Sequence, residues 1–165
     1  MEWSSSLGRM PLERGRDAVF RGRFEHAIDG KGRVSLPARY REALAALRDD
    51  QLVLTTSDEA CLRAYTRQAW REFEEKLAQK PSLDPRVRRV TRHYVGNAQE
   101  CQVDSMGRVL IPSSLRDYAG LARDTVFVGQ VRFIEIWSKD RWQRANQQVL
   151  ELLPADMQAL ADLGI

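Results

Sequence analysis

The motif Asp-x-x-Gly-Arg occurs twice in this chain, at residues 29–33 and again at residues 104–108. Both copies run on to a proline at the same offset, as Arg-Val-Ser-Leu-Pro in the first copy and Arg-Val-Leu-Ile-Pro in the second. Arg41 and Arg116 also follow at equal distances. One such motif can arise by chance, but two with matching flanks indicate a tandem duplication.

The duplication sets the expected organisation of the chain. We expect a flexible N-terminal extension at 1–19, a first repeat at 20–80, a linker helix at 81–96, a second repeat at 97–146 and a C-terminal tail at 147–165. The part that the two repeats have in common is only about 45 residues of short strands and one or two helices, and such a unit buries too little surface to be stable alone. The two repeats should therefore pack together as one domain around a pseudo-two-fold axis.

Residue periodicity predicts the same order of elements in both repeats. Alternating or β-branched runs predict strands at 23–28, 33–36, 52–54, 61–65, 98–103, 108–111, 125–128 and 133–137. Proline and capping residues place helix starts at Pro37, Thr66, Asp84, Pro112 and Ser138. The Asp-Gly pair at 29–30 is a hairpin signal between the first two strands. The fold class is therefore α+β and rich in strands.

Charge is distributed unevenly along the 165 residues, whose net charge is +3. Residues 20–48 carry seven basic against three acidic side chains, and the segment after Asn146 carries only acidic ones. A further basic cluster consists of Arg86, Arg88, Arg89 and Arg92. This asymmetry is compatible with a nucleic-acid partner. The arginines of the further cluster also fit a solvated helix face or a subunit contact.

Several classes of protein are disfavoured by what the sequence lacks. No apolar run approaches the roughly 20 residues of a membrane span, and the first residues lack the apolar core of a secretory signal. Cys61 and Cys101 stand alone, which fits small core residues in a reduced, cytoplasmic protein. We therefore expect no membrane partner and a cytoplasmic location.

Catalytic constellations are not apparent either. The chain has two histidines, His26 and His93, and His26 lies on the apolar side of the first predicted strand. The sequence shows no Ser/His/Asp set, metal-ligand spacing or phosphate-binding loop. We expect a protein that is not an enzyme and that uses no cofactor, metal or small-molecule substrate.

The repeated motif itself allows two interpretations. In a tight turn an aspartate can accept hydrogen bonds from amides two residues on. Asp29 with Arg33, and Asp104 with Arg108, could then be turn-stabilising pairs that bind no ligand. Alternatively the aspartates hold the loops while the arginines project outward, since arginine suits bidentate contact with guanine or phosphate.

The segment 20–37, Phe-Arg-Gly-Arg-Phe-Glu-His-Ala-Ile-Asp-Gly-Lys-Gly-Arg-Val-Ser-Leu-Pro, resembles the opening of the bacterial MraZ family, and 104–112 is similar to the second repeat of that family. The resemblance covers residues 19–146. It implies two fused SpoVT-AbrB-like halves in a swapped-hairpin barrel with peripheral helices. It also implies a transcription factor of the division and cell-wall gene cluster that forms rings and binds short direct repeats upstream of its own operon, usually as a repressor.

In that family the Asp and Arg of the turns form the DNA-contacting element, which carries over to Asp29, Arg33, Asp104 and Arg108. We predict that Arg33 and Arg108 contact base edges of double-stranded DNA in the major groove. A further three basic residues are expected to hold phosphates, which fixes register without reading sequence: Lys31, Arg21 and Arg23.

Two other functions stay open from the residues alone. The chain could be a ring-forming scaffold whose nucleic-acid contact is incidental, or a regulator that binds RNA, because basic turns do not distinguish duplex DNA from RNA. Relatives usually begin with Met at the position of Val19, and bacteria also start translation at GTG codons. We therefore expect residues 1–18 to be an over-called start or a nonessential extension.

Overall fold

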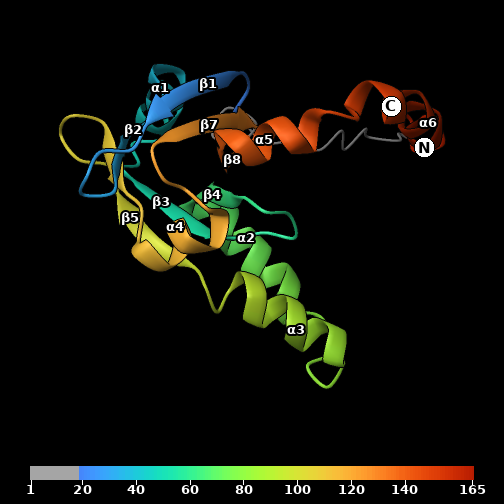
Figure 1. Cartoon of the computed structure of the whole chain (residues 1–165). Coiled ribbons are helices and arrows are strands. Elements are labelled where there is room, and N and C mark those ends of the chain that lie inside the picture. The colour runs from blue at the N-terminus through green and yellow to red at the C-terminus, as the bar shows by residue number, and fades with distance from the viewer. Residues whose placement is uncertain (1–18) are drawn as a thin grey trace, which may run out of the picture.

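The computed structural model describes residues 19–165 (Figure 1). Eight strands occur in this part of the chain: β1 (Arg23–Ala27), β2 (Arg33–Ser35), β3 (Gln51–Thr56), β4 (Leu62–Thr66), β5 (Gln99–Gln102), β6 (Arg108–Leu110), β7 (Asp124–Gly129) and β8 (Phe133–Ser138). Six helices accompany them: α1 (Ala38–Ala46), α2 (Arg67–Ala78), α3 (Pro85–Tyr94), α4 (Ser113–Ala119), α5 (Lys139–Asn146) and α6 (Val149–Ala161). The α+β class is confirmed. The expectations for residues 1–18 lie outside the described part.

The strands form an open sheet, so the predicted closed barrel is wrong. Six strands lie in the order β1-β7-β8-β4-β3-β5, and all their pairings are antiparallel. The other two strands, β2 and β6, pair only with each other. Each is three residues long. Within the described chain, this leaves β1 and β5 as the two edges of the large sheet.

Strand pairing runs across the two repeats. The expected hairpin between 23–28 and 33–36 is also wrong, because β1 pairs with β7 and β2 with β6, while one isolated bridge joins Ile28 to Val34. The turn at 29–32 reverses the chain, but each of its strands finds a partner in the other repeat. When the repeats are exchanged, the strand order of both sheets reads the same. That order is consistent with a pseudo-two-fold axis, which stays a prediction.

One hydrophobic core is shared by the two repeats. Val34 and Leu36 of the first repeat and Val109 and Ile111 of the second are at most 3% exposed and belong to the same cluster. Removal of such side chains from water stabilises a fold by about 1.5–3 kcal/mol each. The repeats therefore pack together through the residues that flank the two Asp-x-x-Gly-Arg motifs.

The predicted helix starts are reproduced by observed caps. The hydroxyl of Thr66 accepts a hydrogen bond from the amide of Ala69 at 3.1 Å, and Ser138 caps α5 in the same way at 3.2 Å. Asp84 caps α3, with Pro85 in its first turn. Pro37 and Pro112 take the N-cap position itself, one residue before the helix. Local chain chemistry thus determines where most of these helices begin.

Helices extend from the sheet in two directions (Figure 1). The pair α2 and α3 packs on β3 and β4 through a cluster built on Trp70 and Tyr65. The predicted C-terminal tail contains a helix, α6, which projects from α5 away from the sheet. Between residues 19 and 165 no helix combines the length and the apolar character that crossing a membrane requires.

Candidate nucleic-acid interface

Both Asp-x-x-Gly-Arg motifs fold into the same turn. Asp29 Oδ1 accepts hydrogen bonds from the amides of Lys31 and Arg33, each at 2.9 Å. Asp104 Oδ1 accepts the equivalent bonds from the amides two and four residues on, at 2.9 and 2.8 Å. In each turn the glycine amide also donates to the carbonyl oxygen of the aspartate, at 3.0 Å in the first and 2.9 Å in the second. The aspartates therefore hold the backbone of both turns.

The second carboxylate oxygen of each aspartate holds an arginine. Arg33 Nε donates to Asp29 Oδ2 at 2.8 Å, and Arg108 Nε donates to Asp104 Oδ2 at 2.9 Å. Among the described residues, the terminal nitrogens of both guanidinium groups have no hydrogen-bond partner. About a third of each arginine side chain is exposed (32% and 29%). Each guanidinium is thus fixed on its Nε side and presents its terminal nitrogens for another contact.

The carboxylates of both turns are kept ionised. The pKa of Asp29 lies below its usual value, first because of the backbone amide of Arg33 and then because of hydrogen bonds and charge from the Arg33 side chain and the Lys31 amide. The pKa of Asp104 is lowered by the equivalent groups, with the Arg108 amide first. The backbone amide thus lowers the pKa of each aspartate more than the charge of the arginine does.

A two-stranded ribbon places both arginines on one face. In the pairing of β2 with β6, Arg33 lies opposite Leu110 and Arg108 lies opposite Ser35. The residues between them on the two strands, Val34 and Val109, point into the core. Because side chains alternate along a strand, the four flanking residues share the outer face. In a regular ladder such diagonal neighbours lie about 7–8 Å apart.

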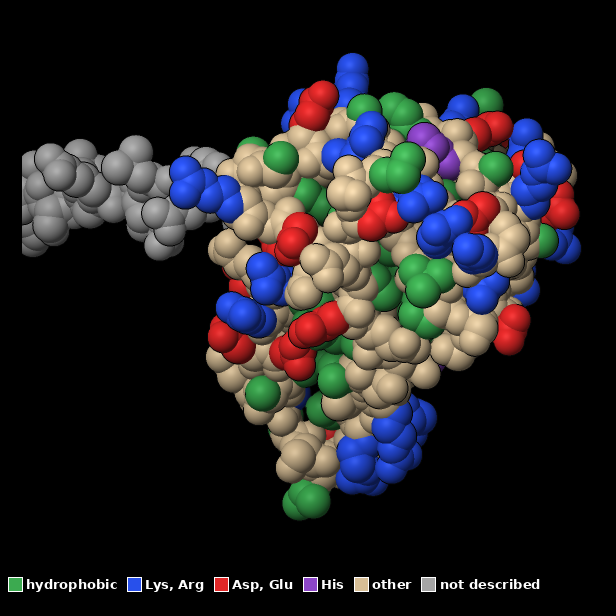
Figure 2. Space-filling view, turned by 90° about the vertical axis from the view of Figure 1, so that its left-hand side faces the viewer, with side chains coloured by type: hydrophobic (Ala, Val, Ile, Leu, Met, Phe, Trp, Pro, Cys, Tyr) green, Lys and Arg blue, Asp and Glu red, His purple; other side chains and the backbone are tan. Residues whose placement is uncertain are grey.

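The two turns lie at opposite ends of this ribbon and are tied to the other strand. Gly32 O accepts a hydrogen bond from the amide of Ile111 at 3.0 Å, and Gly107 O accepts one from the amide of Leu36 at 2.8 Å. Both turns project on the left of Figure 1, on the side away from α6. Figure 2 faces that side and shows basic side chains spread over it among apolar and acidic ones.

Two further arginines lie against the turns, and no role was predicted for them from the sequence. A Cβ on Gly32 would lie 2.8 Å from Arg116 Cζ, and a Cβ on Gly107 would lie 2.5 Å from Arg41 Cδ. Each of these arginines comes from the helix that follows the motif of the other repeat. Their equal spacing after the two motifs was visible in the sequence, but the partner of each was not.

The predicted phosphate-binding residues are only partly brought together. Lys31 is exposed within the first turn, beside Arg33. Arg23 instead begins β1, with its guanidinium 5.7 Å from the centre of the Trp142 ring of α5. Arg21 is exposed two residues before β1. The structure therefore groups Lys31 with the arginines of the ribbon and places Arg23 against α5.

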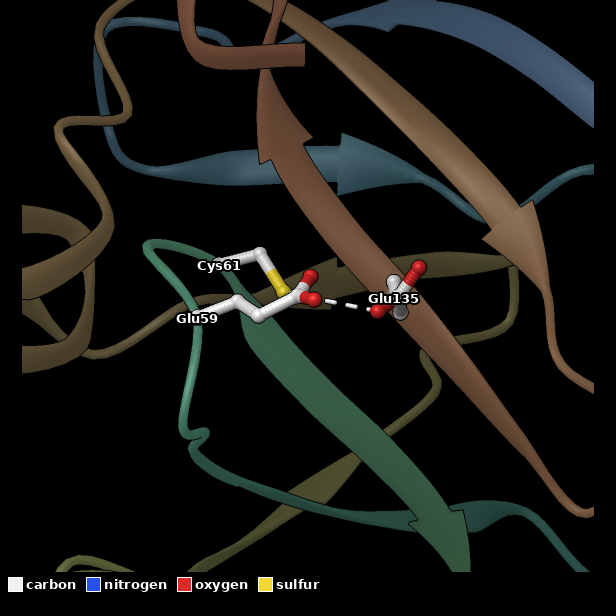
Figure 3. Close-up of side chains that lie close together, drawn as sticks. All are labelled: Glu59, Cys61 and Glu135. Carbon is white, nitrogen blue, oxygen red and sulfur yellow. Dashed lines mark hydrogen bonds between the residues drawn. The ribbon is translucent and has the colours of Figure 1, made fainter. Parts of the chain in front are cut away.

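A group of two carboxylates and a thiol lies elsewhere, between the segment that leads into β4 and strand β8 (Figure 3), and two of its three residues are buried. Potential ligand atoms of Glu59, Cys61 and Glu135 all lie within 4.8 Å of one another. Glu135 Oε1 accepts hydrogen bonds from Gln130 Nε2 at 3.0 Å and from Trp137 Nε1 at 3.3 Å. The sequence did not predict this group because Glu135 lies 74 residues beyond Cys61. The hydrogen bonds of the Glu135 carboxylate are those of a structural group that links β8 to the residues around it.

Comparison with known proteins places the chain in a family. A family model described as "MraZ protein, putative antitoxin-like" matches twice, at residues 19–93 and 94–162, which agrees with the duplication. Three similar proteins all carry the name "Transcriptional regulator MraZ".

The relative from Coxiella burnetii (strain Dugway 5J108-111) is 44% identical over 138 residues, which cover 82% of this chain and 91% of that protein. Relatives from Thioalkalivibrio sulfidiphilus and Desulfitobacterium hafniense (strain DSM 10664 / DCB-2) are 40% and 38% identical, covering 79% and 89% of this chain and 87% and 100% of their own lengths. The chain therefore belongs to the MraZ family.

Proposed function

We propose that this chain is a sequence-specific, DNA-binding transcriptional regulator. The observation that carries the proposal is the β2–β6 ribbon, with Arg33 and Arg108 fixed on its outer face. A two-stranded ribbon fits the major groove of B-DNA, where arginine pairs with guanine O6 and N7. The name shared by the relatives, transcriptional regulator, supports the same proposal.

The spacing of the two arginines suits contacts with base pairs that lie two steps apart. Diagonal neighbours about 7–8 Å apart correspond to about two base-pair steps of 3.4 Å each. Asp29 and Asp104 fix the Nε side of each guanidinium, so less side-chain freedom is lost on binding. In this arrangement the aspartates position the arginines and do not contact the DNA themselves.

The remaining basic residues supply contacts with the phosphates. Lys31 beside the first turn, with Arg21 and Arg23 near β1, fixes the register of the protein on the duplex. Arg41 and Arg116 flank the turns and add positive charge to the same face. Affinity that depends on these residues falls as salt rises, because phosphate contacts release counterions.

One ribbon presents a small footprint, so affinity for a single site should be low. We propose that copies of the chain assemble into a ring that binds several short direct repeats upstream of its own operon, in the division and cell-wall gene cluster, and represses it. Simultaneous binding raises avidity by about 10²–10⁴-fold without new contacts. Such a protein acts in the cytoplasm, at the nucleoid.

Fluorescence anisotropy with the full chain tests the proposal. The duplex directly upstream of the gene is compared with a scrambled duplex at several salt concentrations, for wild type, Arg33→Ala and Arg108→Ala. Arg71→Ala is the matched control, because Arg71 is exposed on α2 and its loss changes charge equally. Each ribbon variant should lose about 1–3 kcal/mol of binding free energy and part of its preference for the native duplex, while Arg71→Ala binds like wild type.

Three outcomes would overturn the proposal. Equal binding of Arg33→Ala and wild type to the native duplex would remove the ribbon from recognition. Equal and steeply salt-dependent binding to both duplexes would leave only phosphate attraction, as expected of an assembly scaffold. Stronger competition by the matching RNA than by the DNA would indicate an RNA-binding regulator instead.

A further inference from the structure

Helix α6 exposes an apolar surface that no described part of the chain covers. None of its residues is buried. Leu150 is 80% exposed, Leu152 56%, Leu153 44% and Met157 49%. Val149, Leu153, Met157 and Leu160 recur at helical spacing, so they form one stripe. Scattered apolar residues on a surface are ordinary, but a contiguous stripe of four apolar residues along one helix marks an interaction site.

A groove of complementary character lies between α2 and α3. It has a volume of about 600 Å³, and its apolar lining includes Leu77, Ala78, Val87 and Val95. Lys80, Arg88 and Arg92 also line it. Among the described residues, nothing occupies this groove.

The groove has an excess of basic residues, because Lys80, Arg88 and Arg92 line it against one acidic residue, Glu74, whereas the charged residues of α6 are acidic. Helix α3 carries four arginines and no acidic residue. Helix α6 carries Glu151 and Asp156, has Asp162 as its C-cap residue and contains no basic residue. Opposite charges at the rim of an apolar contact steer association and fix its register. The basic helix and the acidic, apolar helix are therefore suited to pack against each other.

Geometry prevents this contact within one chain. Figure 1 shows α3 at the bottom of the molecule and α6 at the upper right, beyond α5. Only Gln147 and Gln148 separate α5 from α6, and two residues span at most about 7 Å. Helix α5 is itself fixed to the sheet, with the Trp142 ring 5.9 Å from that of Trp137. Helix α6 must therefore reach a groove on another molecule.

We propose that α6 of one copy of this chain docks in the α2–α3 groove of a second copy. The contact joins two different surfaces, so it repeats head to tail and gives a ring when the rotation closes. This inference rests on the assembly included in the proposed function and names the two surfaces that form it. It also assigns a role to the acidic C-terminal segment and to the arginines of α3.

Cross-linking between two chains that each carry one added cysteine tests the docking directly. One chain carries Met157→Cys on the α6 stripe, and the other carries Ala78→Cys, at an exposed residue of the groove. The native thiols of Cys61 and Cys101 are buried and should not interfere. After mild oxidation, the mixture should give a product of twice the 18.9 kDa chain mass, and neither chain alone should.

A matched control completes this test, and two results would overturn the docking. Gln158→Cys lies next to Met157 but on the polar side of α6, and it should cross-link at least tenfold less with Ala78→Cys. If the mixture gives no product of twice the chain mass, or if Gln158→Cys gives as much as Met157→Cys, the docking is wrong. Occupation of the groove by residues 1–18 or by an unrelated protein would produce the first of these results.

Charge exchange tests the electrostatic part in solution. Light scattering of the full chain should show a fall toward 18.9 kDa for Arg88→Glu with Arg92→Glu, and likewise for Glu151→Lys with Asp156→Lys. A chain with all four substitutions should assemble again. An unchanged mass in every variant would overturn the proposal, as would a fourfold variant no heavier than its parents.

Failure of this inference is distinguishable from failure of the proposed function. Arg33→Ala should lose DNA preference while its cysteine variants still cross-link. The α6 charge variant should keep its affinity for a duplex with one repeat and lose the extra affinity for a duplex with several. If cross-linking fails while the DNA preference of wild type persists, only the docking is wrong.

Discussion

Arg116 packs its guanidinium over Gly32, so close that a Cβ at residue 32 would lie 2.8 Å from Arg116 Cζ and 3.1 Å from its Nε. The Nε atom is buried and has no hydrogen-bond partner within the described chain. The same relationship joins Arg41 to Gly107. An arginine of each repeat thus packs against the turn of the other repeat. These contacts connect the two turns through the shared core, in addition to the connection through the ribbon.

This packing predicts that replacement of either glycine destabilises the folded protein. Gly32 and Gly107 have φ values of +87° and +75°, which cost a residue with a Cβ about 1–2 kcal/mol. We expect Gly32→Ala and Gly107→Ala each to lower the free energy of unfolding by at least that amount, measured in urea. Gly30→Ala is the control, since nothing lies within 4 Å of its Cβ position. An equal loss in all three would show that the arginine contact and the positive φ do not matter.

Most of the local structure could be predicted from the residues themselves. The caps at Thr66, Asp84 and Ser138, and the left-handed Gly120 with φ +62° that ends α4, depend only on neighbouring residues. Strand partners could not be predicted, because β1 and β7 are about a hundred residues apart, as the bond from Thr125 Oγ1 to His26 O illustrates. Pairing across repeats is a property of the whole fold.

In the candidate site, too, the local structure could be predicted from the sequence and the contacts between distant residues could not. The turns and the outward arginines follow from the motif, because the aspartate bonds span at most four residues. The ribbon that sets the spacing of Arg33 and Arg108, and the packing of Arg41 and Arg116, depends on contacts between repeats. Helix α6 was predicted only as a tail, since its apolar residues have no partner within the described chain.

His26 predicts a pH dependence of stability. Its ring lies 5.8 Å from that of Phe127, and burial, followed by the charge of Arg41, lowers its pKa below 6.5. Between the two pKa values the unfolded state binds more protons, so stability is complete above about pH 6.5 and falls as pH drops through the folded value. In melting curves from pH 7.5 to 5, His26→Gln should lose stability less steeply than wild type. Identical slopes would contradict this assignment.

The cysteines should be unreactive in the folded protein. Burial raises the pKa of Cys61 to about 12 and that of Cys101 to about 11. The thiolate is the reactive form, and its fraction at pH 8 falls by about two to three orders of magnitude relative to a free thiol of pKa near 8.5. A disulfide reagent should label neither residue within minutes in buffer and both in guanidinium chloride. Rapid labelling of the native protein would mean that these sites open.

Asp29 should act on DNA only through Arg33. A double-mutant cycle with Asp29→Ala, Arg33→Ala and both together should give a coupling energy of about 0.5–3 kcal/mol in DNA binding. Asp29→Asn should reduce DNA binding less than Asp29→Ala does, because asparagine keeps an acceptor for the turn amides. Loss of a carboxylate also raises attraction to any duplex, so the measured quantity is the ratio of affinities for the upstream and scrambled duplexes.

The pair Asp104 and Arg108 should give the same result, since its distances match within 0.1 Å (2.9 against 2.8 Å for the ion pairs). If Asp29→Ala reduces the ratio as much in the Arg33→Ala background as in wild type, the carboxylate contributes independently of the arginine, and its positioning role is wrong.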